Sequence, residues 1–191
     1  MKQIGRVLVV TALPSELKVE GAPNGVDVIF GGLGKINNAM KVTEALLKAK
    51  PSLVVNYGTC GRINSRLNGL VEIAKVVQRD MAAMPLAPRG VTPLSDDPPI
   101  LLSGHGTATC GTGDSFVTSP DPWLIENNVD VVDMELFAIA LVCTRFDVPW
   151  RAFKFITDDA NDDAHGHWQE NVAKGEDLFW GKLKSLAAHS K

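Results

Sequence analysis

The stretch 131–161 constrains the fold of this chain more than any other, because it reads as strand, helix and strand. The first strand is short, Val131–Val132, and apolar residues at helical spacing follow it as far as Phe146. Pro149 ends that helix, since proline lacks a backbone N–H group and disfavours helix in the residue before it. Trp150–Ile156 is a second strand. This alternation is typical of α/β sheets.

Acidic residues stand where the predicted strands end. Glu135 follows the first strand of this stretch and Asp158 the second. A valine-rich run typical of a strand buried on both faces, Arg6–Ala12, leads to Pro14 and Glu16. Pro14 suits a first helical turn, so Glu16 either stabilises a helix N-terminus or belongs to a site. Ligands of α/β sheets bind outside the carboxyl ends of strands, and three acids at three such ends favour a site.

The rest of the chain supplies further strands and helices. Strands are expected at Val26–Phe30, Ser52–Asn56 and Glu72–Gln78, with a helix at Asn38–Lys48. The Gly-x-Gly turn after residue 30 lacks the third glycine of a dinucleotide fingerprint, so a tight strand-to-helix turn is expected. Residues 81–100 have few periodic positions and five prolines, which predicts a surface loop. The tail, 164–191, is predicted to close the fold as a helix.

Composition narrows the class of protein. A chain of 191 residues is predicted to form one domain, 1–191, which can bury roughly 70% of its unfolded surface. The net charge of −3 gives no indication of a basic surface that would bind nucleic acid. The apolar runs are too short to span a bilayer, and the N-terminus does not resemble a cleavable signal peptide. The three cysteines are odd in number and widely spaced, so we expect a reduced, cytoplasmic setting without disulfides.

One cluster could suggest a metal site. Asp162, Asp163, His165 and His167 crowd together just before the predicted tail helix. Such residues also occur as the polar start of a helix, and we favour that interpretation. No metal and no other cofactor is therefore expected.

The residues around Glu135 and Asp158 resemble a motif pair of the nucleoside phosphorylase and nucleosidase superfamily, in particular of the 5′-methylthioadenosine/S-adenosylhomocysteine nucleosidases. The first motif is an acidic residue, Met-Glu and a small-residue helix, here Asp133-Met134-Glu135. The second, about twenty residues later, is Ile-Ser/Thr-Asp, here Ile156-Thr157-Asp158. The resemblance covers roughly residues 5–175, with gaps in 81–107. It implies a three-layer α/β/α sandwich around a twisted, mixed sheet, and a homodimer.

The resemblance also implies roles for the acids. Glu16 would be the base that activates water, and Asp158 would protonate or hydrogen-bond N7 of the departing purine. Glu135 would accept hydrogen bonds from the ribose hydroxyls and support the positive charge that develops on the sugar. Lys154 stands where the nucleosidases usually have arginine.

Seven further positions match residues that line the family's pocket. Phe116 follows Gly-Asp-Ser and would stack on the nucleobase, although it could equally be ordinary core. Cys60 is more consistent with a small filler than with a nucleophile, because no histidine is near it in sequence. The set that the resemblance assigns to substrate binding beside Glu135 is Cys60, Gly61, Phe116, Val117, Asp133, Met134 and Thr157.

The function implied is hydrolysis of the N-glycosidic bond of an adenine nucleoside, such as 5′-methylthioadenosine or S-adenosylhomocysteine. Two alternatives stay open: a phosphorylase of the same superfamily, and a non-catalytic nucleoside-binding protein. Retention of all three acids argues against the second. A carboxylate at Glu16 would repel a phosphate anion, which favours water as the nucleophile.

Overall fold

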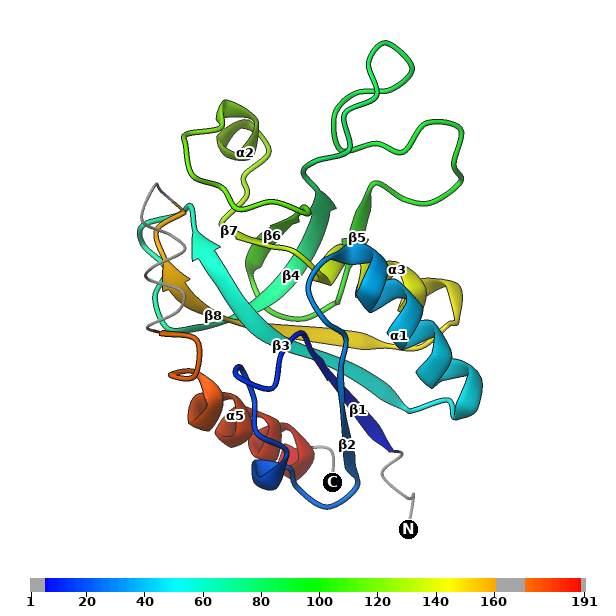
Figure 1. The fold of residues 1–191 in the computed structure, drawn as a ribbon, viewed down its shortest axis with the longest axis vertical. Helices are drawn as coiled ribbons and strands as arrows, with labels where there is room; N and C mark the ends of the chain where they lie inside the picture. Colours follow the sequence, from blue (N-terminus) through cyan, green and yellow to red (C-terminus); the bar gives the residue numbers. More distant parts are fainter. Residues whose placement is uncertain (1–5, 161–170, 190–191) are drawn as a thin grey trace.

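The computed structural model describes residues 6–160 and 171–189, and it shows an eight-stranded mixed sheet flanked by helices (Figure 1). The strands are β1 Val7–Thr11, β2 Val26–Phe30, β3 Leu53–Arg62, β4 Leu70–Gln78, β5 Ile100–Leu102, β6 Ala108–Thr112, β7 Val131–Asp133 and β8 Trp150–Asp158. The helices are α1 Lys35–Lys48, α2 Pro122–Glu126, α3 Leu136–Arg145 and α5 Glu176–His189, with a short 3-10 turn at Val19–Gly21.

Two groups of strands run in opposite directions. Strands β2, β1, β3 and β8 are parallel to one another, as are β7, β6 and β4. The groups meet in antiparallel pairs at β3–β7 and at β4–β8, and β5 adds an antiparallel edge strand to β4. Because β8 pairs with both β3 and β4, the strands β3, β7, β6, β4 and β8 form a closed ring.

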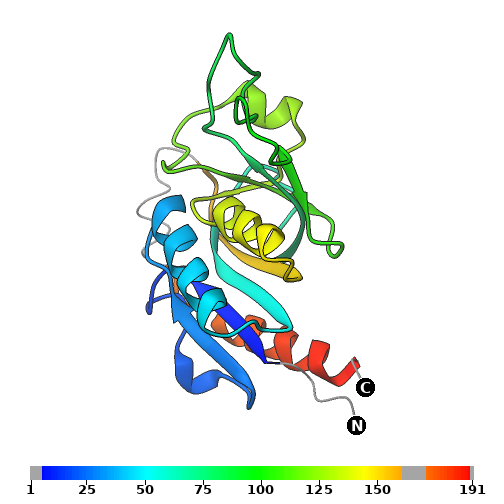
Figure 2. The same cartoon turned by 90° about the vertical axis from the view of Figure 1, so that its right-hand side faces the viewer.

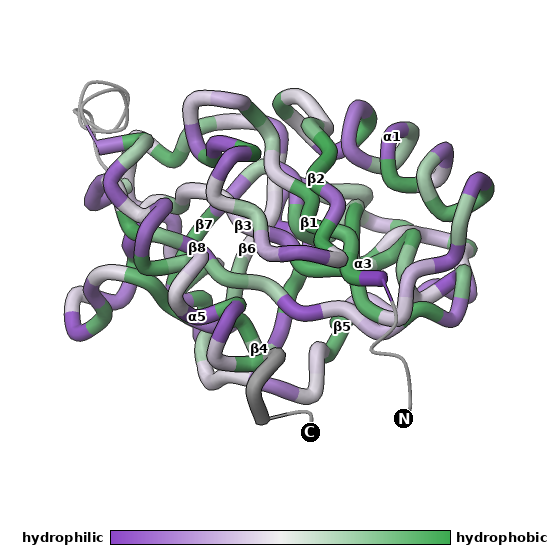
Figure 3. Tube along the Cα trace, turned by 90° about the horizontal axis from the view of Figure 1, so that it is seen from below, coloured by the Kyte–Doolittle hydropathy of each residue, from purple (hydrophilic) through white to green (hydrophobic). Residues whose placement is uncertain are grey.

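Helices cover both faces of the sheet, which confirms the predicted α/β/α layering. The apolar faces of α1 and α3 pack on one face through residues such as Val42, Leu46 and Ile139. Phe179, Trp180 and Leu183 of α5 pack on the other face. Figure 2 shows α1 and α3 together on one side of the strands. In Figure 3, α1 alternates between hydrophobic and hydrophilic residues, as a half-exposed helix must.

The structure corrects two local predictions. The strand predicted at Ser52–Asn56 does not end there but continues through residues 57–61, which include two glycines, to Arg62. It stays in the sheet because its neighbours β1, β7 and β8 pair with successive parts of it. The helix predicted from Pro14 does not form: residues 14–16 are a turn.

Other predicted boundaries are close to those observed. Helix α1 begins three residues before the predicted Asn38, directly after Gly34, whose φ of 88° is the left-handed conformation that glycine tolerates. Helix α3 ends before Pro149 as predicted, and residues 81–99 form the expected loop. The short strand β5 at the end of that loop was not predicted.

The described ranges contain no helix that is long and apolar enough to cross a membrane. They also contain no group of three or more His, Cys, Asp or Glu side chains suited to a metal ion. The candidate metal residues Asp162, Asp163, His165 and His167 lie outside the described residues.

Candidate functional site

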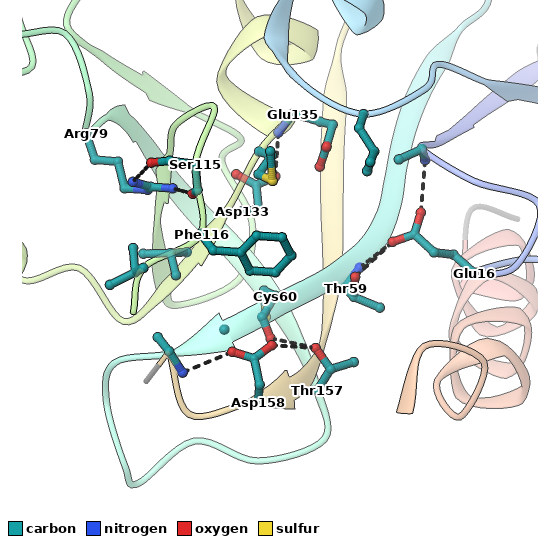
Figure 4. A pocket seen from close by; sticks show the side chains of 17 residues that line it. Glu16, Thr59, Cys60, Arg79, Ser115, Phe116, Asp133, Glu135, Thr157 and Asp158 are labelled. Carbon is teal, nitrogen blue, oxygen red and sulfur yellow. Dashed lines mark hydrogen bonds between the residues drawn. The ribbon is translucent and has the colours of Figure 1, made fainter. Parts of the chain in front are cut away.

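One pocket brings together every side chain that the sequence assigned to a site (Figure 4). It encloses about 780 Å³, including its open mouth, and lies where β3, β7 and β8 end. The predicted residues that line it are Glu16, Cys60, Gly61, Phe116, Val117, Asp133, Met134, Glu135, Thr157 and Asp158. These predicted residues come from five separate segments of the chain, which converge on one cavity.

Glu16 is buried and is held by donors from β3 and from the end of β1. Its Oε1 accepts hydrogen bonds from the backbone N–H (3.0 Å) and the hydroxyl (2.9 Å) of Thr59. Its Oε2 accepts from the hydroxyl of Thr11 and from the N–H groups of Ala12 and Leu13, at 3.0–3.1 Å. Residues 11–16 thus form a turn around the carboxylate of Glu16, which explains why a turn replaces the predicted helix. The same bonds fix the carboxylate at the pocket wall.

Asp158 ends β8 and is fixed by its own neighbours. The hydroxyl of Thr157 donates to Oδ2 at 2.9 Å, and the N–H of Ala160 donates to Oδ1 at 3.0 Å. Glycine at position 61 makes this placement possible, because a Cβ there would lie 2.8 Å from Asp158 Oδ1. Glycine at position 61 therefore has a steric reason in this chain.

A buried charge cluster stands at the opposite side of the pocket. Lys154 and Asp133 form an ion pair at 2.7 Å, and their side chains are 1% and 0% exposed. Asp133 also accepts from the hydroxyl of Thr112 and from the N–H of Leu136, which begins α3. Glu135 lies beside this pair, and its Oε1 accepts from the N–H of Gly34 at 3.1 Å. The Gly-x-Gly turn is thus a tight turn, as predicted, and also supports a site residue.

The charges in this cluster shift one another's ionisation. Burial raises the pKa of Glu135 to about 7, the charge of Asp133 adds to the rise, and Lys154 opposes it. Burial also disfavours the charged form of Asp133, but the Lys154 ammonium outweighs it and lowers that pKa below its ordinary value. For Lys154, burial opposes the charge, yet Asp133 and Glu135 raise its pKa above the ordinary value. Asp133 and Lys154 are therefore both charged at neutral pH, whereas Glu135 titrates there.

The raised pKa of Glu135 predicts a stability cost that depends on pH. Between an ordinary value near 4.5 and about 7, the folded state holds a proton that the unfolded state has lost, so stability falls as pH rises through this window. We expect Glu135→Gln to increase the free energy of unfolding at pH 8 by on the order of 1–3 kcal/mol. The gain should be much smaller at pH 5. Urea unfolding at both pH values measures this gain in the free energy of unfolding. Glu20→Gln, at an exposed position, is the control. An equal gain at both pH values would contradict a raised pKa of Glu135.

Phe116 and Cys60 both line the pocket, but Phe116 is partly exposed whereas Cys60 is buried. Phe116 is 46% exposed and borders the pocket, so it is not ordinary core. In Figure 4 its ring lies between the carboxyl groups of Glu135 and Asp158. Cys60 is buried, and burial raises the pKa of its thiol well above the ordinary value. A neutral, buried thiol fits the role of a small filler rather than that of a nucleophile.

Sequence reasoning missed Arg79, which lines the same pocket and is 5% exposed. Its Nη2 donates to the carbonyl oxygens of Gly113 (3.0 Å) and Ser115, so it fixes the backbone next to Phe116. In the sequence, only the position of Arg79 directly after β4 could have pointed to a place in the site. The other lining residues that the sequence analysis did not assign are Ala12, Leu33, Thr59, Ser115, Val132 and Ala160.

Comparison with known proteins identifies relatives of this chain. A profile of the phosphorylase superfamily matches residues 24–187. The 5′-methylthioadenosine/S-adenosylhomocysteine nucleosidase of Staphylococcus aureus (strain MRSA252) is 32% identical over 171 residues, covering 78% of this chain and 75% of the relative. The enzyme of the same name from Haemophilus influenzae (strain PittEE) is 29% identical over 184 residues, covering 84% and 80%.

Solved structures share the fold at lower identity. A Helicobacter pylori nucleosidase mutant with 5′-methylthioadenosine in its active site superposes with a TM-score of 0.83 at 19% identity, over 97% of this chain and 99% of that one. The futalosine hydrolase of Helicobacter pylori superposes with a TM-score of 0.85 at 18% identity, over 99% and 100%. These two matches establish the architecture.

Proposed function

This chain belongs to the phosphorylase superfamily, and from that premise we propose that it hydrolyses the N-glycosidic bond of a purine nucleoside. One observation carries the proposal: Glu16, Glu135 and Asp158, from three separate strand ends, line a single pocket with an aromatic ring between two of them. The named relatives are 5′-methylthioadenosine/S-adenosylhomocysteine nucleosidases, and we take 5′-methylthioadenosine and S-adenosylhomocysteine as the substrates to test first.

Two carboxyl groups divide the work on the substrate. A purine leaves a sugar slowly unless its ring nitrogen N7 is protonated or hydrogen-bonded, and Asp158 supplies that group. The flat base stacks on Phe116. Glu135, in its ionised form, accepts from the ribose hydroxyls and favours the positive charge that develops on the sugar. Because the pKa of Glu135 is about 7, this support is fully present only above neutral pH.

Glu16 serves as the base that takes a proton from the attacking water. Water suits this corner of the pocket better than phosphate, which needs cationic or amide donors around it. Among the described residues nearby, Lys154 is already paired with Asp133 and Arg79 is turned to the carbonyl groups of residues 113 and 115. A carboxylate about 4 Å from phosphate would add a repulsion on the order of 1–4 kcal/mol.

Release of free adenine tests the proposal. Purified protein in a phosphate-free buffer should convert 5′-methylthioadenosine or S-adenosylhomocysteine to adenine, which chromatography detects directly. Binding of either nucleoside without any release of base would instead support a nucleoside-binding protein. The predicted homodimer and the cytoplasmic setting stay predictions.

A further inference from the structure

A second cavity lies beside the candidate active site and shares two of its lining residues. Its volume, including its open mouth, is about 1230 Å³, and Val117 and Ala160 line both cavities. The other lining residues come from loop 118–121, from α2, from Arg62 and Ile63 at the end of β3, and from Asp159 after β8. We call this cavity the side groove.

The side groove has an apolar floor. Ile63, Val117, Leu124 and Ala160 belong to one hydrophobic cluster, and all four line the groove. The same cluster contains Val132, which lines the active-site pocket. This hydrophobic cluster therefore borders both cavities.

Most of the charged side chains that line the side groove already form ion pairs. Arg62 donates to Asp159 at 2.6 Å, and Asp121 accepts from Arg89 at 2.5 Å. Arg62 is the cation among the described lining residues, and its charge is already neutralised, while Glu126 adds a negative charge. The groove thus disfavours phosphate and carboxylate groups and suits an uncharged aliphatic or aromatic group.

The proposed orientation of the purine aims one substituent at this groove. With N7 at Asp158 and the ribose at Glu135, the group adjacent to N7 on the side away from the sugar is the one on C6. Asp158 Oδ1 accepts from the N–H of Ala160, so the carboxyl stands against the shared wall. A substituent on the exocyclic N6 would extend across that wall.

We propose that the side groove binds an apolar substituent on N6 of the purine, so that the enzyme accepts N6-alkyl and N6-aryl adenine nucleosides. The inference rests on the proposed function, because that function sets the orientation of the base. A flat benzyl group is a suitable probe, since it would cover the apolar floor.

Binding of free bases tests the groove without any need for turnover. Calorimetry should show that N6-benzyladenine binds about tenfold more tightly than adenine. Thr118→Trp, which fills the groove from an exposed position outside the active-site pocket, should abolish this advantage while leaving the Kd of adenine unchanged. Thr107→Trp, also exposed but remote from both cavities, is the matched control.

Each outcome decides the proposal. N6-benzyladenine that binds no more tightly than adenine overturns it, and so does an equal effect of the two tryptophan variants. If Thr118→Trp does not fold, Ser119→Trp from the same wall replaces it. A parallel assay compares base release from adenosine and N6-benzyladenosine. Absence of release from both, with the predicted order of base affinities intact, would count against the hydrolase and not against the groove.

Discussion

Asp158→Asn is expected to reduce the rate of purine release by at least about a hundredfold while the protein stays folded. An amide cannot supply the proton that the departing base needs at N7. It keeps nearly the same shape, and its oxygen can still accept from the N–H of Ala160. The hydroxyl of Thr157 can turn to accept from the new NH₂ group, so the local structure should persist. Steady-state rates and circular dichroism of the purified variant measure both parts of the expectation.

The neighbouring acid provides the matched control for this variant. Asp159 is exposed and bonds to Arg62 outside the active-site pocket. Asp159→Asn should therefore leave the rate within a few-fold of wild type. Wild-type turnover in a folded Asp158→Asn protein would remove Asp158 from the mechanism.

Lys154→Met is expected to lower the free energy of unfolding by about 3–5 kcal/mol. Methionine fills a similar volume, but it leaves the buried carboxylate of Asp133 without its ion partner. The cost comes from that uncompensated charge rather than from loss of a favourable pair. Chemical denaturation at pH 7.5 measures it, and a loss below about 1 kcal/mol would contradict a charged, paired cluster.

A surface pair serves as the control for this prediction. Lys41 and Glu44 lie 3.8 Å apart on α1, and both side chains are at least half exposed. Such pairs contribute little, so Lys41→Met should change stability by no more than about 0.5 kcal/mol. Lys154→Arg, which restores the residue usual in the resembling nucleosidases, keeps the charge and should lose less than Lys154→Met.

The site was largely predictable from sequence because its residues follow strand ends in short motifs. Asp133, Glu135 and Asp158 could be placed near one another once β7 and β8 were recognised as strands. Glu16 followed from the same rule applied to β1. Phe116 and Val117 depended on the family resemblance, since periodicity alone could not distinguish a pocket ring from core.

The features of the fold and site that could not be predicted depend on contacts between segments that are distant in the sequence. The closed ring of strands arises because β8 pairs with β3 on one edge and β4 on the other, and local sequence carries no signal for the second pairing. The role of Lys154 was uncertain for the same reason: its partner Asp133 is 21 residues earlier in the chain. The shift in the pKa of Glu135 needed the buried neighbours and the exclusion of water, which only the folded structure provides.

Identification of the sugar product in phosphate buffer tests the central claim most directly. The protein is incubated with 5′-methylthioadenosine at increasing phosphate concentrations, and the sugar is identified by mass. Hydrolysis with Glu16 as the base predicts free 5-methylthioribose at a rate independent of phosphate, and Glu16→Gln should suppress its formation. Recovery of a sugar 1-phosphate, with a rate that rises in proportion to phosphate, would contradict the hydrolase and identify a phosphorylase.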